Sequence, residues 1–96
     1  MYKVEMTEIF QDWRNSLKDS KAVRAIRARL DHITLGHLGD TKPVGGGVFE
    51  LRMHLSPGYR LYFVNKTGRI ILLLCGGNKS SQSKDIARAQ KLAREI

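Results

Sequence analysis

The stretch "VFELRMHLSPGYRLYFVNKTGRIILLLC", residues 48–75, contains three segments with the periodicity of β-strands, separated by two short turns. In residues 48–55 apolar and polar side chains alternate, as in a strand with one buried face. Residues 59–65 alternate again, and in residues 69–75 a continuous apolar run follows Arg69, as expected for a central strand covered on both faces. "SPG" and "KTG" supply the turn residues between the segments. The stretch therefore predicts an antiparallel meander of three strands.

Helical periodicity follows the meander. From Ser80 to Ile96 four apolar side chains recur on one face of a predicted helix: Ile86, Ala89, Ala93 and Ile96. Three basic side chains recur on the opposite face: Lys84, Arg88 and Lys91.

Two shorter helices are predicted before the meander. The first covers roughly Thr7 to Leu17, with Thr7 as its cap and Phe10, Trp13 and Leu17 at helical spacing. Asp19 or Ser20 caps the second, which Gly36 ends. Its apolar stripe is Val23, Ile26, Leu30 and Ile33, and its other faces carry Arg24, Arg27 and Arg29.

The remaining segments complete the expected order. Residues Tyr2 to Met6 alternate weakly and predict a short strand, whereas Leu38 to Gly47 has a proline and four glycines without periodicity and is expected to be a loop. The order is then strand, helix, helix, three strands and helix. Helices segregated from an antiparallel sheet define an α+β fold.

The composition limits the classes of function. The chain has 96 residues, the size of one small domain, with 17 Lys and Arg against 9 Asp and Glu, a net charge of +8 and a pI near 10.1. This balance favours an anionic partner such as nucleic acid or an acidic protein. The absence of a long apolar run or a signal-like start predicts neither membrane span nor export, and the lone Cys75 suits a reducing cytoplasm. One Cys and three scattered His give no zinc spacing, so neither a metal nor another cofactor is expected.

The corner "GGNKSS", residues 76–81, superficially resembles half of a phosphate-binding loop. It lacks the spacing of G-x-x-x-x-G-K-[ST], and the predicted sheet is antiparallel, so no nucleotide cofactor is expected. Glycines that turn the chain and serines that cap the next helix explain the corner except for Lys79. This lysine leaves the last strand beside a helix N-terminus, where free N–H groups also favour an anion.

Five polar side chains share one parity on the first two strands of the meander: Glu50, Arg52, His54, Arg60 and Tyr62. Closure of the hairpin at "SPG" lets them converge on one face of the sheet. A solvated outer face is the alternative, although such faces usually carry Thr, Ser or Lys. The pattern favours a functional cluster.

Together "FELRMHLSPGYRLYF" (residues 49–63) and "LLLCGGNKSSQSKDIARAQKLA" (residues 72–93) resemble the phage-type, HigB-like addiction-module killer proteins of the RelE/ParE toxin superfamily. The resemblance runs over nearly the whole chain. It implies one RelE-like toxin domain over residues 1–96, and the toxin of a type II toxin–antitoxin system in the cytoplasm. It also implies a cognate antitoxin, in the HigB branch usually a small helix-turn-helix protein. RelE-like members cleave mRNA on the ribosome and so inhibit translation, whereas ParE-like members poison DNA gyrase.

The resemblance also implies site residues. The Arg that follows Gly-Tyr is Arg60, the basic residue after the last strand is Lys79, and the basic strand positions fall on Arg52 and His54. The Tyr or His that the family often places near the C-terminus is missing, and Asp85 stands near that place.

Metal-free RNA cleavage uses the 2′-OH as nucleophile and needs proton transfer and cations on the phosphate. Arg52 and Arg60 suit the phosphate, Lys79 adds a point charge, and His54 is the candidate for acid or base. The ribosome could position the substrate. Four basic residues of the helices are expected to contact RNA phosphates: Arg24, Arg27, Lys84 and Arg88.

Three functions remain open at this point. The four convergent groups favour a ribosome-dependent endoribonuclease, an mRNA interferase. Arg60 alone does not discriminate, because Gly-Tyr-Arg also resembles ParE-like sequences, whose members bind gyrase without nuclease chemistry. The missing C-terminal base leaves an inactive relic as the third alternative.

Overall fold

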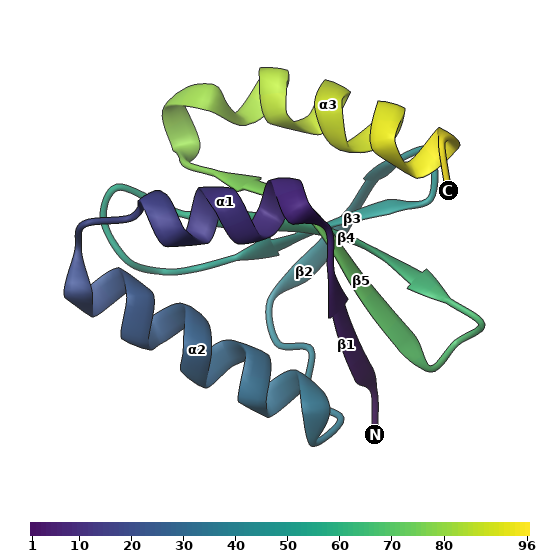
Figure 1. Cartoon of the computed structure of the whole chain (residues 1–96), viewed down its shortest axis with the longest axis horizontal. Helices are drawn as coiled ribbons and strands as arrows, with labels where there is room; N and C mark the ends of the chain where they lie inside the picture. The colour runs from purple at the N-terminus through teal and green to yellow at the C-terminus, as the bar shows by residue number, and fades with distance from the viewer.

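A five-stranded sheet with helices on both faces forms the molecule (Figure 1). The computed structural model describes all residues from 1 to 96. Along the chain the elements are β1 (Lys3–Met6), α1 (Glu8–Ser16), α2 (Ser20–Thr34), β2 (Thr41–Gly45), β3 (Val48–Arg52), β4 (Arg60–Lys66), β5 (Ile70–Gly77), the 3₁₀ turn η1 (Lys79–Ser81) and α3 (Gln82–Arg94). The predicted α+β class is confirmed, with one strand more than expected.

The strands lie in the order β1-β5-β4-β3-β2. β3, β4 and β5 form the predicted antiparallel meander, and β1 joins it by parallel pairing with β5. In the β3–β4 hairpin Arg52 is the register partner of Arg60, and Glu50 is the partner of Tyr62. Since register partners point to the same face of a sheet, these four side chains share one face.

Side-chain caps begin the two N-terminal helices where the sequence predicts them. The Thr7 hydroxyl accepts a hydrogen bond from the Phe10 N–H (3.0 Å) at the start of α1. At the start of α2 the cap is Asp19 rather than Ser20, because the Asp19 carboxylate accepts from the Lys21 N–H (3.0 Å). Such caps satisfy N–H groups that have no partner within the helix. The longest helix, α2, has 15 residues, and none of the three is long and apolar enough to cross a membrane.

Each face of the sheet carries its own apolar core. On one face α1 and α2 pack against the meander, and the fully buried members include Phe10, Ile26, Ile33, Leu51, Leu61 and Leu73. On the other face α3 packs Ala89 against Leu72 and Leu74. In Figure 1 α2 and α3 accordingly lie on opposite sides of the sheet. The sheet is therefore covered on both faces, which explains why β5 is a continuous apolar run.

The prediction of a loop from Leu38 to Gly47 is wrong for its second half. Residues 41–45 form β2, which pairs antiparallel with β3 and is an edge of the sheet. Its sequence "TKPVG" does not alternate between apolar and polar residues. Pro43 has no backbone N–H and therefore does not fit a central strand, which is hydrogen-bonded on both sides. An edge strand tolerates such a residue, because only one side is paired.

Element ends also differ from the prediction. β3 ends at Arg52 instead of residue 55, since residues 53–59 form a wider loop. In this loop the Met53 N–H donates to the Tyr59 carbonyl (2.9 Å) and the Gly58 N–H donates to the Leu55 carbonyl (2.6 Å). The last helix begins at Gln82, after η1, and ends at Arg94. Ile96 therefore lies beyond the helix and is 63% exposed, not inward as predicted.

Candidate functional site

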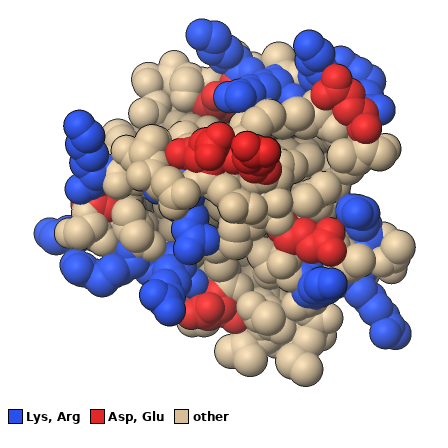
Figure 2. Space-filling model, viewed as in Figure 1, with Lys and Arg blue, Asp and Glu red and all other residues tan.

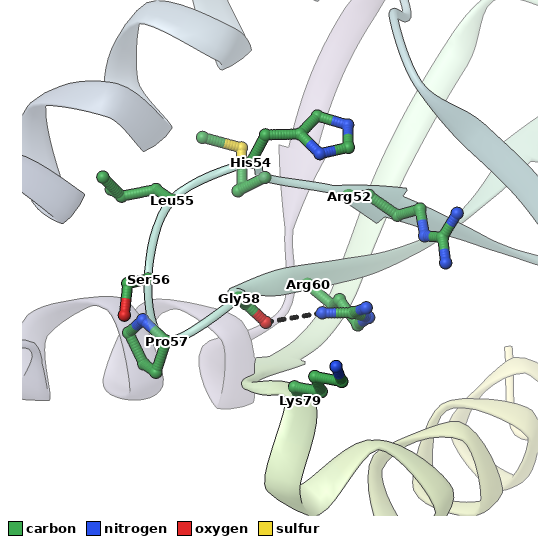
Figure 3. Close-up of a pocket in the computed structure, with 9 residues that line it drawn as sticks. Arg52, His54, Leu55, Ser56, Pro57, Gly58, Arg60 and Lys79 are labelled. Atoms are coloured by element: carbon green, nitrogen blue, oxygen red, sulfur yellow. Dashed lines mark hydrogen bonds between the residues drawn. The ribbon is translucent and has the colours of Figure 1, made fainter.

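A basic cleft of about 450 Å³ lies where the β3–β4 hairpin closes. It is lined by the loop residues 53–58 together with Arg52, Arg60 and Lys79 (Figure 3). The four residues predicted to be catalytic therefore line one cleft, although they come from β3, the hairpin loop, β4 and η1. In Figure 3 the Arg52, Arg60 and Lys79 side chains extend in the same direction from their three elements. Three cations on converging elements suit an anionic ligand with several oxygens.

Arg60 is the most tightly held of these cations. Its side chain is only 11% exposed. Its Nη1 donates to the Gly58 carbonyl (2.7 Å), and Gly58 has a positive φ of 85° that favours glycine. A Cβ at Gly58 would lie 3.1 Å from Arg60 Nη1 and 3.4 Å from Lys79 Cβ. The missing side chain at Gly58 thus lets Arg60 and Lys79 approach the loop.

A buried carboxylate lies beneath the two arginines. Glu50 is 0% exposed, with Oε1 3.5 Å from Arg52 Nε and Oε2 3.7 Å from Arg60 Nε. The Oε2 atom accepts hydrogen bonds from the Tyr62 hydroxyl (3.2 Å) and from Gln82 Nε2 (2.8 Å). The predicted convergence of polar side chains is real for Glu50, Arg52, Arg60 and Tyr62. Glu50 and Tyr62 are buried under α3 and form no solvated face.

Burial also decides the protonation of two further groups on this face. Burial, the Glu50 charge and the hydrogen bond to Glu50 raise the pKa of Tyr62 above its usual range. The phenol therefore acts as a donor to Glu50 and does not serve as a base. Burial, assisted by the charge of Asp85, raises the pKa of Cys75 to about 11, so this thiol stays protonated and is no nucleophile at neutral pH.

His54 lines the cleft from the hairpin loop, outside β3. Its Nε2 lies 2.6 Å from Asp40 Oδ2, and its side chain is 75% exposed. The Asp40 carbonyl accepts from the Arg52 N–H (3.0 Å), which fixes the backbone of Asp40 next to the end of β3. The structure therefore pairs the imidazole with a carboxylate that the sequence analysis did not identify.

The glycine corner before Lys79 has a packing role. A Cβ at Gly76 would overlap the Trp13 ring, and a Cβ at Gly77 would overlap the Asp85 carboxylate. Asn78, not the serines, caps the following turn, because its Oδ1 accepts from the Ser80 N–H (3.0 Å). Glycines inside a strand are expected where another group approaches the backbone closely.

Asp85 does not line the cleft. Its carboxylate accepts a hydrogen bond from the Ser81 hydroxyl (2.5 Å) and packs against Gly77. Asp85, the residue expected from the sequence near the place of a missing C-terminal Tyr or His, is thus engaged in holding the start of α3.

The four residues predicted to contact RNA do not form one surface. Arg24 and Arg27 are exposed on α2, and Lys84 and Arg88 are exposed on α3, on the opposite face of the sheet. None of them lines the cleft. Figure 2 shows Lys and Arg spread along the margins of one face, with Asp and Glu between them.

Arg29 is a structural residue that the sequence analysis left on the polar side of α2. Its guanidinium donates to the carbonyls of Leu38 (3.3 and 3.4 Å), Asp40 (3.5 Å) and Arg52 (3.2 Å). Burial lowers its pKa, and the charge of Asp40 opposes this shift. Its helical spacing from Ile26 and Ile33 is the signal that it borders the buried stripe.

Residues 12–95 match the family described as "Phage derived protein Gp49-like (DUF891)". The chain belongs to this family. This Gp49-like protein is also 43% identical over 94 residues to an uncharacterized protein of Haemophilus influenzae, covering 98% of this chain and 95% of that protein.

Solved structures of the Escherichia coli RelE toxin are similar in fold to the Gp49-like protein. RelE in the intact RelBE toxin–antitoxin complex has a TM-score of 0.66 at 16% identity, covering 81% of this chain and 96% of RelE. Isolated RelE has a TM-score of 0.66 at 16% identity, covering 92% and 98%. A RelE mutant bound to a peptide of the antitoxin RelB has a TM-score of 0.64 at 13% identity, covering 88% and 93%. The predicted RelE-like fold is confirmed.

Proposed function

We propose that this Gp49-like protein is the toxin of a type II toxin–antitoxin pair and cleaves mRNA on the ribosome without a metal ion. The observation that carries the proposal is the meeting of Arg52, Arg60, Lys79 and His54 in one cleft. A protein that only binds a partner needs no such set of phosphate-binding groups beside an imidazole.

The chemistry proposed for the cleft is attack of a ribose 2′-oxygen on the adjacent phosphorus. The bond to the 5′-oxygen breaks, which leaves a 2′,3′-cyclic phosphate and a 5′-hydroxyl. Arg52 and Arg60 stabilise the negative charge on the phosphorane oxygens, and Lys79 adds a third positive charge. Arg60 is well suited to this work, because Gly58 holds its guanidinium in place before substrate arrives.

His54 is the proposed proton acceptor. With Nε2–H donated to Asp40, Nδ1 is the nitrogen left to take the proton of the 2′-hydroxyl. The structure offers no second imidazole or free phenol in the cleft lining. The proton for the leaving 5′-oxygen is therefore assigned to the ribosome or to water, and the ribosome supplies much of the substrate orientation.

An antitoxin partner is part of the proposal. The RelE structures of the same fold are described as toxin–antitoxin and toxin–antitoxin-peptide complexes. By the resemblance to the HigB branch, the antitoxin proposed here is a small helix-turn-helix protein, and both act in the cytoplasm. The net charge of +8 suits both an acidic partner and ribosomal RNA.

A gyrase-binding toxin without nuclease chemistry is the second candidate. One observation favours it: Asp85, near the place where the resemblance implies a C-terminal Tyr or His, bonds Ser81 outside the cleft, so His54 is the one imidazole in the cleft lining and no phenol joins it. A decayed, inactive protein would carry the same feature.

Primer extension on mRNA from bacterial cells that express the protein separates these candidates. The nuclease produces cuts inside translated codons, and these cuts vanish in Arg60→Ala and in transcripts without a start codon. The matched control is Arg69→Ala, which removes an exposed arginine in the turn at the other end of β4 and should cut like the wild type. DNA damage without mRNA cuts would establish the gyrase candidate, and unchanged growth would establish the inactive one.

A further inference from the structure

Glu50 is a charged side chain in the second core, and its surroundings do not explain it as ordinary packing. It is 0% exposed, and its Oε1 atom has no hydrogen-bond partner. Taking a carboxylate out of water costs several kcal/mol unless opposite charges and hydrogen bonds compensate. An apolar or amide side chain would fill this position at a lower cost. The compensation that Glu50 does receive comes from the two arginines of the cleft, from Tyr62 on β4 and from Gln82 on α3.

The cations around Glu50 are the two arginines of the proposed site. Arg52 and Arg60 are register partners, and like charges directly opposite each other on neighbouring strands repel. Arg52 Nε lies 3.5 Å from Glu50 Oε1, and Arg60 Nε lies 3.7 Å from Glu50 Oε2. The Arg60 Nε has no other partner. One buried anion thus faces the Nε side of both guanidinium groups, which line the cleft, and Arg60 Nη1 in addition donates to the Gly58 carbonyl.

The position of Glu50 is fixed from the opposite side. Tyr62 and Gln82 both donate to Oε2, and Gln82 belongs to the first turn of α3. The raised pKa of Tyr62 keeps its phenol a donor. Strand β3, strand β4 and helix α3 therefore meet at one carboxylate, which connects the docking of α3 to the orientation of the arginines.

We propose that Glu50 is a positioning residue, which holds Arg52 and Arg60 in the orientation that fits the phosphate in the transition state. It contacts no substrate, since it is buried beneath them. The effect of Glu50 on the reaction rests on the nuclease function proposed above. Its ion pairs with Arg52 and Arg60 do not depend on that function. The carboxylate also lowers the positive potential of the cleft, so it weakens phosphate binding in the ground state while it orders the guanidinium groups.

Glu50→Gln tests the inference with little change of shape. A glutamine oxygen in the place of Oε2 keeps the bonds from Tyr62 and Gln82. Its NH₂ group takes the place of Oε1, so the negative charge beside both arginines is lost and Arg52 Nε faces a donor instead of an acceptor. In the protein alone, ¹⁵N NMR of the arginine Nε–H groups is expected to show ordered Arg52 and Arg60 in the wild type. In Glu50→Gln these signals should become averaged and exchange faster with water. Glu95→Gln, an exposed change of the same charge, should leave them unchanged.

Single-turnover cleavage of mRNA on programmed ribosomes then measures the effect on the reaction. In Glu50→Gln the rate at saturation should fall about tenfold or more, while the half-saturating concentration stays equal or decreases. If Glu50 only stabilised the fold, Glu50→Gln would lower the melting temperature. The rate at saturation and the half-saturating concentration, per folded molecule, would then stay unchanged. If Glu50→Gln does not fold, Tyr62→Phe removes one anchor of Glu50 and should produce smaller changes in the same direction.

Ordered Arg52 and Arg60 signals in both variants would overturn the inference. Absence of cleavage by the wild type would overturn the proposed function instead, and the NMR comparison would still decide the role of Glu50.

Discussion

Asp85 occupies the space in which a side chain at Gly77 would begin. The first turn of α3 lies directly on the end of β5 at this point, and Ser81 holds the Asp85 carboxylate there. The distance from β5 to α3, and with it the position of Lys79 between them, therefore depends on the absence of one Cβ.

Gly77→Ala is expected to destabilise the protein by about 1–3 kcal/mol, because the new methyl group must displace Asp85 or the backbone. It should also reduce mRNA cleavage, since a shift of α3 moves Lys79 out of the cleft. Urea unfolding followed by circular dichroism measures the stability. Gly68→Asn is the control, as Gly68 has open space and a positive φ that asparagine tolerates. Equal stability of Gly77→Ala and the wild type would contradict the close approach.

Arg60→Lys keeps the charge of the cleft and removes the planar fork. Lysine cannot place donors at the same time on the Gly58 carbonyl, beside Glu50 and on a phosphate oxygen. We expect a loss of about 10- to 100-fold in the rate of mRNA cleavage on ribosomes. Arg52→Lys should cost less, because Arg52 is 38% exposed and has no backbone bond from its side chain that would be lost. If Arg60→Lys is as active as the wild type, charge alone suffices at this position.

The sequence patterns predicted the fold better than the site. Alternation in residues 48–65 identified β3 and β4, because side chains of a half-covered strand must alternate. β2 gave no such signal, since an edge strand with a proline needs neither alternation nor full pairing. A glutamate at a polar position of an alternating strand is expected to face solvent. Glu50 is buried instead, because α3 packs over it. The contact between Asp40 and His54 could not be predicted either. It depends on the pairing of β2 with β3, and β2 was not predicted.

Because of Cys75, the free energy of unfolding is expected to depend on pH in the alkaline range. Its pKa in the folded protein, about 11, lies above that of an exposed thiol. The contribution is complete below the unfolded pKa near 9 and is lost as the pH rises through 11, because the unfolded thiol releases its proton first. We expect the free energy of unfolding to fall between pH 9 and 11, by about 2 kcal/mol less in Cys75→Ser than in the wild type. Urea unfolding at several pH values measures both, and parallel curves would rule out this role for the thiol.

Arg29→Met is expected to destabilise the protein by about 2–4 kcal/mol, because the methionine fills part of the volume but the carbonyls of Leu38, Asp40 and Arg52 lose their shared donor. Arg24→Met on the exposed side of the same helix is the matched control and should change the stability by less than about 0.5 kcal/mol. Thermal and urea unfolding compare the two. If both variants are equally stable, Arg29 does not hold the start of β2.

Salt dependence distinguishes the two pairs of basic helix residues. Lys84 and Arg88 lie on α3, which begins next to the cleft, whereas Arg24 and Arg27 lie on α2 across the sheet. One RNA strand in the cleft is therefore expected to continue along α3. Replacing Lys84 and Arg88 by glutamine should reduce the magnitude of the negative slope of log affinity for ribosomes against log salt by about 1–2, because binding releases fewer counterions when phosphate contacts are lost. The same replacement of Arg24 and Arg27 should leave the slope unchanged. If only the replacement of Arg24 and Arg27 reduces the magnitude of the slope, the RNA lies on the α2 face of the sheet and not along α3.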